Sequence, residues 1–208
     1  MPRLMDMGLE RLSNAICDMG NLAQDSVMKA IQAYATGQRI TKEALDRARQ
    51  LSMLANEVDE LAVELLARYQ PVATDLRFIK SCLEISYGFS RFGRYAFDIA
   101  QVLEIYGDLP ECDKTVVEEL STKVAQMIKT SIESFKARDM KLARSLRQDD
   151  DQVDRVYLGY MREVSQGKLI PVKCALASTL VLRYLERIAD HACYIGDSVI
   201  YIVTGSKI

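Results

Sequence analysis

The chain has 208 residues, of which 49% are apolar, enough to bury a sizeable core as one large helical domain or as two smaller ones. Its 27 basic and 29 acidic residues are mixed along the sequence and leave a formal charge of -2, which excludes the basic excess that nucleic-acid binding needs. Charges interrupt every long apolar stretch well before the ~20 residues of a membrane span, and no apolar leader opens the sequence, so we expect a cytoplasmic protein.

Three long helices are predicted in the first half of the chain, over residues 3–35, 41–69 and 75–106. Glycine and proline fall between the periodic segments, as expected where they punctuate helices. Thr41 is expected as the N-cap of the second helix, and Pro71 separates the second helix from the third.

Three more helices are predicted in the second half. Residues 110–113 are expected to form a turn and the N-cap of the fourth helix, which meets the fifth helix at 137–139. The fifth helix is expected to end near Gly167, and the sixth to cover 172–204 before Gly205. Strand patterns are almost absent, so the predicted fold class is all-α, a bundle of six long helices.

The two halves of the sequence resemble each other. Leu-Glu-Arg-Ile-Ala-Asp-His-Ala at 185–192 aligns with Phe-Ser-Arg-Phe-Gly-Arg-Tyr-Ala at 89–96, an offset of 96, and Asp-Gln-Val-Asp at 151–154 aligns with Asn-Glu-Val-Asp at 56–59, an offset of 95. A nearly constant offset indicates a tandem duplication. We therefore expect two three-helix bundles related by a pseudo-two-fold axis. The two predicted units are residues 1–108 and 109–208.

The sequence spacing of four acidic residues in the second half predicts that their side chains lie close together. Asp150 and Asp154 are four residues apart, as are Glu186 and Asp190, so each pair lies on one face of its helix. If the two helices form an antiparallel hairpin, the pairs are equidistant from the turn at 167–171 and lie level. Like charges this close need a neutralising cation or basic group.

A hard cation would suit these carboxylates, because magnesium, manganese, calcium and oxidised iron prefer oxygen ligands. Zinc would be expected to bring histidine or cysteine, and His191 lies about 140° around the helix from Glu186. The alternative is an ordinary solvated face in which Arg183 and Arg187 form surface ion pairs with the acids.

The first half repeats the hairpin but not its acids. Ala55, Ser90 and Arg94 stand where Asp150, Glu186 and Asp190 stand in the second half, and only Asp59 remains. We predict no metal there. Arg94 is expected to supply the positive charge instead, pairing with Asp59 across the hairpin or with Asp98 one turn on.

The cysteines are expected to be free and to act as small buried apolar residues in a reducing cytosol. They are odd in number, widely spaced and form no CxxC pair. The five are Cys17, Cys82, Cys112, Cys174 and Cys193.

Three segments resemble signature segments of the PhoU family, and the match spans nearly the whole chain. They are Glu-Val-Asp-Glu-Leu at 57–61, Gln-Pro-Val-Ala-Thr-Asp-Leu-Arg-Phe at 70–78 and the segment at 185–192. The family's E(D)xxxD motif is similar to Asp150-xxx-Asp154 and to Glu186-xxx-Asp190. The resemblance implies two similar three-helix bundles, a homodimer or larger assembly, and a multinuclear iron cluster or other metal ions at these motifs, with iron, zinc, magnesium and manganese all open.

In function, the resemblance implies a negative regulator of phosphate uptake and homeostasis that is not an enzyme. Its implied partners are the ATPase subunit of the high-affinity Pst transporter and, where present, a phosphate-sensing histidine kinase, with membrane association only through partners. The altered motifs of the first half leave one metal site where the family pattern has two.

Three alternatives remain open from the sequence. One is a PhoU-like accessory protein of another phosphate or metal transporter. Another is a carboxylate-bridged metal enzyme, although the Glu-x-x-His ligands of di-iron oxidases are missing. The third is a structural adaptor whose acidic residues only solvate its surface.

Overall fold

The computed structural model describes residues 4–167 and 170–206, which form six helices and no strand. This confirms the predicted all-α fold, and the helix ends agree with the predicted ones to within two residues, the usual variation at frayed ends. Residue 3, the predicted start of the first helix, lies outside the described residues. The helices are α1 (Leu4–Thr36), α2 (Thr41–Tyr69), α3 (Ala73–Tyr106), α4 (Thr115–Ala137), α5 (Met140–Ser165) and α6 (Val172–Thr204).

The start of α2 differs from the predicted cap. Ile40 is the N-cap, and its side chain offers no hydrogen bond to the helix. Thr41 is the first helical residue, and its hydroxyl donates to Glu104 Oε1 at 3.0 Å on α3. The threonine therefore ties α2 to α3 instead of capping its own helix, a tertiary role that local sequence does not reveal.

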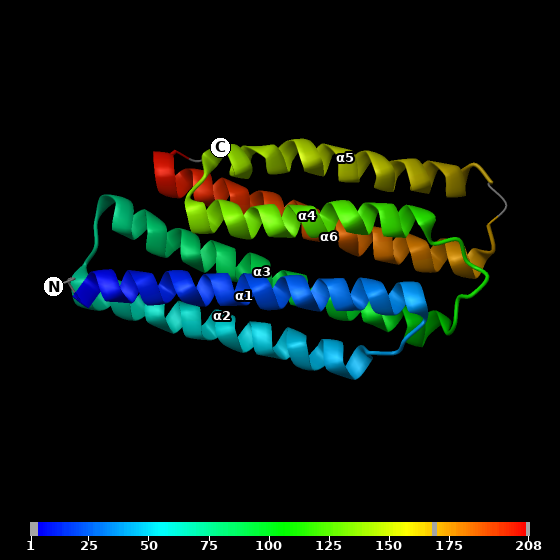
Figure 1. Cartoon of the computed structure of the whole chain (residues 1–208), viewed down its shortest axis with the longest axis horizontal. Coiled ribbons are helices and arrows are strands. Elements are labelled where there is room, and N and C mark those ends of the chain that lie inside the picture. Colours follow the sequence, from blue (N-terminus) through cyan, green and yellow to red (C-terminus); the bar gives the residue numbers. More distant parts are fainter. Residues whose placement is uncertain (1–3, 168–169, 207–208) are drawn as a thin grey trace.

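The six helices form two three-helix units that lie side by side (Figure 1). Within each unit every helix contacts the other two, and the units meet through α1 against α4 and α3 against α6. The meeting helices run in opposite directions, so one unit is turned end to end relative to the other. This arrangement agrees with the pseudo-two-fold expected from the sequence repeat.

One hydrophobic core runs through both units. Its central residues include Phe89 and Phe92 on α3 and Ile188 on α6, all fully buried. A Cβ on Gly88 would lie 3.1 Å from Ile195 Cγ1, so glycine lets α3 and α6 approach closely. The shared core braces α6 from the side opposite to α5. No helix within the described ranges is both long and apolar enough to cross a bilayer.

The expectation that all five cysteines are free is wrong. Cys112, in the linker between α3 and α4, forms a disulfide with Cys174 in the first turn of α6, and their Cα atoms are 5.3 Å apart. The remaining cysteines are free, with Cys82 and Cys193 buried and Cys17 half-buried. The pairing joins residues 62 positions apart, so it depends on tertiary proximity that spacing alone does not show.

Candidate functional site

The structure brings the four predicted acids together between α5 and α6. Asp150 and Asp154 lie on α5, and Glu186 and Asp190 lie on α6, which packs against α5. Burial raises the pKa of Asp150 from its ordinary 3.8 to about 6, and the charges of Asp190, Asp154 and Glu186 add to the effect. Burial, followed by the charge of Asp190, also raises the pKa of Glu186. Each carboxylate thus destabilises the charged form of its neighbours.

Two oxygen atoms of this acidic cluster are buried without a hydrogen bond. They are Asp150 Oδ1 and Glu186 Oε2, and neither has a hydrogen-bond partner among the described residues. Glu186 is only 8% exposed. Buried polar atoms are nearly always satisfied in folded proteins, so an open pair requires an explanation. The donor set, carboxylate oxygens only, fits a hard metal ion.

The four carboxylates of the acidic cluster do not converge on one point as the ligands of a bound metal ion would. Within 4–167 and 170–206, no three of these four residues have carboxylate oxygens that all lie within 4.8 Å of one another. Binding a cation at the cluster would therefore require rotamer changes that draw the carboxylates inward. Such changes are open to residues at the rim, because Asp150, Asp154 and Asp190 are each partly exposed.

Two arginines of α6 cover the rim of the acidic cluster. Arg183 Nη1 donates to Glu186 Oε1 at 2.7 Å, and Arg187 Nη1 donates to Asp190 Oδ2 at 3.3 Å. The ion pairs of Arg183 and Arg187 with the acids, expected from the sequence as the alternative to a metal site, are therefore present. Arg187 Nε also lies in ion-pair range of Glu186 Oε2, at 4.0 Å, which is too far for a hydrogen bond. Both arginine side chains are more than a third exposed, at 37% and 45%, so each contact contributes little and is easily exchanged.

His191 lies on the α3 side of α6. Its ring packs against Tyr87 and Tyr95 of α3 and against Tyr194, with ring centroids 6.0, 5.9 and 5.7 Å away. Burial lowers the pKa of His191 to about 4, with Arg91 adding to the effect. The imidazole is therefore neutral at pH 7 and belongs to the α3–α6 contact.

The first half contains a cation of its own in the equivalent place. Arg94 Nε lies 3.1 Å from Asp98 Oδ1, so of the two predicted partners the structure shows Asp98. Asp59 is exposed, and among the described residues it has no ion pair with Arg94. Ser90 points back to its own helix, where its hydroxyl donates to the Tyr87 carbonyl at 2.8 Å.

Sequence reasoning missed two further features. One is a groove of about 670 Å³ between α3 and α6, whose walls include Tyr87, Tyr194 and Tyr201. The seven-residue spacing of the two α6 tyrosines, which places them on one face, is the signal that could have found it. The other is the close approach of Glu111, Cys112 and Cys174, for which the sequence carries no local signal.

Comparison with known proteins agrees with the fold and the repeat. The family model described as PhoU domain matches twice, over residues 16–103 and 117–199. The phosphate-specific transport system accessory protein PhoU homolog of Pseudomonas aeruginosa is 30% identical over 207 residues, covering 96% of this chain and 85% of that protein. The PhoU homolog 1 of Methanothermobacter thermautotrophicus is 27% identical over 212 residues, covering 99% and 94%.

Solved structures show the same architecture. The crystal structure of PhoU from Pseudomonas aeruginosa matches with a TM-score of 0.87 at 30% identity, covering 97% of this chain and 99% of that one. The phosphate transport system regulatory protein PhoU from Streptococcus pneumoniae matches with a TM-score of 0.90 over 98% and 99%, at 20% identity that speaks for the fold alone. Two family matches that together cover most of the sequence show that this chain belongs to the PhoU family.

Proposed function

We propose that this protein regulates phosphate uptake by contacting the phosphate-specific ABC transporter through its ATPase subunit and restraining it when phosphate is plentiful. The observation that supports this is the double PhoU-domain match over 16–103 and 117–199. The printed names of the relatives, accessory proteins of the phosphate-specific transport system, point in the same direction. The protein acts by binding, in the cytoplasm where the ATPase subunit lies, and catalyses no reaction.

The proposed contacts depend on a metal ion at the acidic cluster. Asp150, Asp154, Glu186 and Asp190 would hold the ion, which when bound would neutralise their mutual repulsion and satisfy the two open buried oxygens. Glu186 anchors the site, because its side chain is the most buried of the four, and Arg187 steadies Asp190 at the rim. Arg183 and Arg187 also present guanidinium groups at the surface, where carboxylates of a partner could pair with them.

Two further partners belong to the proposal. A phosphate-sensing histidine kinase, in organisms that have one, would be restrained through the same regulator. A second copy of this chain would complete a homodimer. A response of these partners to phosphate requires that the partner or the ion binds one helix arrangement of this protein more tightly than another. Equal affinity for both arrangements would leave the conformational equilibrium unchanged.

Complementation of a strain that lacks the gene tests the proposal. The wild-type gene is expected to lower phosphate uptake in phosphate-rich medium and to silence a phosphate-starvation reporter. The double substitution Glu186→Gln and Asp190→Asn is expected to lose both effects. Asp46→Asn is the matched control, because Asp46 lies in an exposed ion pair with Arg49 on α2, and it should behave as wild type.

Two results would contradict the proposal. Uptake and reporter output that are the same with and without the wild-type gene would remove the link to phosphate. Normal phosphate control together with altered metal uptake would assign the protein to a metal transporter instead. Copurification with the ATPase subunit identifies the direct partner.

A further inference from the structure

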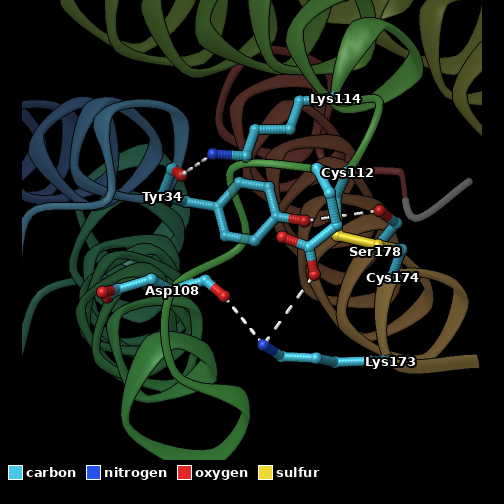
Figure 2. The surroundings of a disulfide bond; sticks show 8 residues. Tyr34, Asp108, Cys112, Lys114, Lys173, Cys174 and Ser178 are labelled. Atoms are coloured by element: carbon cyan, nitrogen blue, oxygen red, sulfur yellow. Dashed lines mark hydrogen bonds and ion pairs between the residues drawn. A yellow bond between two sulfur atoms is a disulfide. The ribbon is translucent and has the colours of Figure 1, made fainter. Parts of the chain in front are cut away.

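A second cluster of metal-ligating groups lies at the end of the bundle where the linker between the two units meets the first turn of α6 (Figure 1). Figure 2 shows the disulfide of Cys112 and Cys174 there, between Lys114 and Lys173. One oxygen of Glu111 and the two sulfur atoms all lie within 4.8 Å of one another. Across the described ranges this is the only trio of histidine, cysteine or acidic side chains gathered so closely.

We propose that these three residues form a zinc site when the disulfide is reduced, and that a disulfide oxidant, which takes up the two electrons and leaves as two thiols, re-forms the Cys112–Cys174 bond and expels the ion. Thiolate ligands select soft and borderline metals, and two thiolates with one carboxylate and one water make a four-coordinate zinc site. The oxygen-only acidic cluster prefers harder ions, so the two sites differ in the metal they take.

The redox step balances with a dithiol reductant. One thiolate of the reductant attacks a sulfur of the Cys112–Cys174 bond and forms a mixed disulfide, and its second thiol then displaces the protein sulfur. The reductant ends as a disulfide, having supplied two electrons and two protons. The protein ends with two thiols, which lose those protons when they bind zinc.

The local geometry allows the change from disulfide to metal site. Bonded sulfur atoms are about 2.0 Å apart, whereas two sulfur ligands of tetrahedral zinc, each at about 2.3 Å from the metal, stand roughly 3.8 Å apart. Cys174 is held in the first turn of α6, but Cys112 lies in the non-helical linker before α4. A small shift of the linker therefore opens the space. Glu111 is exposed, and one of its oxygens already lies within 4.8 Å of both sulfur atoms.

Two lysines balance the charge of the ligands. Two thiolates and one carboxylate carry three negative charges, one more than zinc neutralises. Lys173 Nζ lies 4.0 Å from Glu111 Oε1 and donates to the Asp108 carbonyl at 2.8 Å. Lys114 Nζ is fixed on the carbonyls of Tyr34 and Ala35 at 3.0 and 2.9 Å. Figure 2 shows the disulfide between these two lysines, and positive charge on both sides of it favours thiolates over thiols and thus favours metal binding.

The site connects the two three-helix units. The Tyr34 hydroxyl on α1 and the Ser178 hydroxyl on α6 are 3.3 Å apart beside the disulfide, and Lys114 joins the linker to the end of α1. Either a disulfide or a zinc bridge would link Cys112 of the linker to Cys174 of α6, and only the reduced, metal-free protein lacks a link through these sulfur atoms. Cytosolic disulfides are usually transient or redox-sensing, so in a reducing compartment the zinc form would be the resting one.

Cobalt titration of the full-length protein tests the proposal, because thiolate-to-cobalt charge transfer gives a near-ultraviolet absorption that carboxylates do not produce. Protein reduced with a phosphine, which is then removed, is expected to bind one equivalent of cobalt with this absorption, and zinc should displace it. The disulfide form is expected to show none. A reduced wild-type protein without the absorption would overturn the proposal.

Variants assign the ligands. Cys112→Ser and Cys174→Ser should each abolish or strongly reduce the absorption, whereas Cys17→Ser, at a half-buried free cysteine of α1, should leave it intact. Glu111→Gln leaves the disulfide in place and should weaken zinc binding by roughly tenfold or more. Glu186→Gln with Asp190→Asn should keep the absorption, which separates this site from the acidic cluster. An undiminished absorption in the double variant Cys112→Ser and Cys174→Ser would overturn the assignment.

Discussion

Arg94 and Asp98 form an ion pair one helical turn apart on α3, with Nε 3.1 Å from Oδ1. Arg94 stands at the position that Asp190 holds in α6, so the first unit carries a covalently attached cation where the second unit has an additional acid. Together with Ala55 and Ser90, which stand where Asp150 and Glu186 stand, this substitution leaves the first unit without an acidic cluster. It also leads to two predictions about the first unit.

Asp98→Asn is expected to stabilise the protein at neutral pH. Burial raises the pKa of Asp98, and Arg94 offsets this only in part. Because the pKa in the folded state lies above that of the unfolded chain, the charged carboxylate costs stability, and this cost appears as the pH rises through the folded pKa. Urea denaturation should give a larger free energy of unfolding for the variant than for wild type at neutral pH. The difference between the two proteins should be smaller near pH 4, about the ordinary aspartate pKa.

The exposed Asp46 supplies the control for this experiment. Its ion pair with Arg49 lies at the surface, with side chains 60% and 69% exposed, so Asp46→Asn should leave the free energy of unfolding nearly unchanged at both pH values. Equal or lower stability of Asp98→Asn at neutral pH would show that the ion pair outweighs the cost of burial.

Restoring the acids should give the first unit a cation site. The triple substitution Ala55→Asp, Ser90→Glu and Arg94→Asp joins Asp59 to reproduce the set of four found in the second unit. We expect bound metal per chain, measured by elemental analysis, to rise about twofold over wild type. Without metal the variant should be less stable, because four like charges then meet unpaired. Unchanged metal content in a folded variant would show that the acids alone do not make the site.

Asp150→Asn is expected to act in opposite directions with and without metal. In the metal-free protein it removes a carboxylate whose charged form is disfavoured by burial and by four neighbouring acids, so the free energy of unfolding should rise by about 1 kcal/mol after allowance for solvent screening. Wild-type protein should gain about 2.7 kcal/mol at a metal concentration of about 100 times Kd, and the variant clearly less. Thermal unfolding with and without metal measures both effects. A variant that gains as much as wild type would exclude Asp150 as a ligand.

Close packing of α5 against α6 gives a test that involves no charge. A Cβ on Gly196 would lie 2.9 Å from both the Ala143 carbonyl oxygen and Leu146 Cδ1, whereas a Cβ on Gly159 would meet nothing within 4 Å. Gly196→Ala should therefore destabilise the fold by about 1–3 kcal/mol. Gly159→Ala, also inside a helix, should stabilise it by about 0.5–1 kcal/mol. Chemical denaturation of the two variants provides the comparison, and equal effects would contradict the packing described.

The helices were predictable from the sequence because their signals are local. Apolar periodicity marks the helices that the structure shows, and Pro71, Gly107 and Gly205 mark where helices end. The sequence repeat indicates that the two halves have the same three-helix arrangement. The predictions that the structure contradicts concern residues whose roles are set by tertiary contacts. Thr41 binds Glu104 on another helix instead of capping its own, and no pattern near residue 41 distinguishes these roles.

Only the part of the candidate site that lies within one helical hairpin, α5 and α6, was predictable from the sequence. The i,i+4 spacing of the acids and their equal distance from the turn sufficed to place Asp150 near Glu186. The pairing of Cys112 with Cys174 joins a linker to a helix 62 residues away, and it depends on how two units dock. The choice of Asp98 over Asp59 as the partner of Arg94 depends on side-chain orientation that spacing leaves open.

Elemental analysis of the disulfide-oxidised protein, purified without chelator, tests the central claim most directly, because oxidation removes the cysteines as ligands. We predict at least one equivalent of a hard metal ion in wild type and little in the double variant Glu186→Gln and Asp190→Asn, with both proteins folded. Wild-type protein that stays metal-free in metal-supplemented buffer, or a double variant that keeps its metal, would contradict the assignment of the acidic cluster as a metal centre.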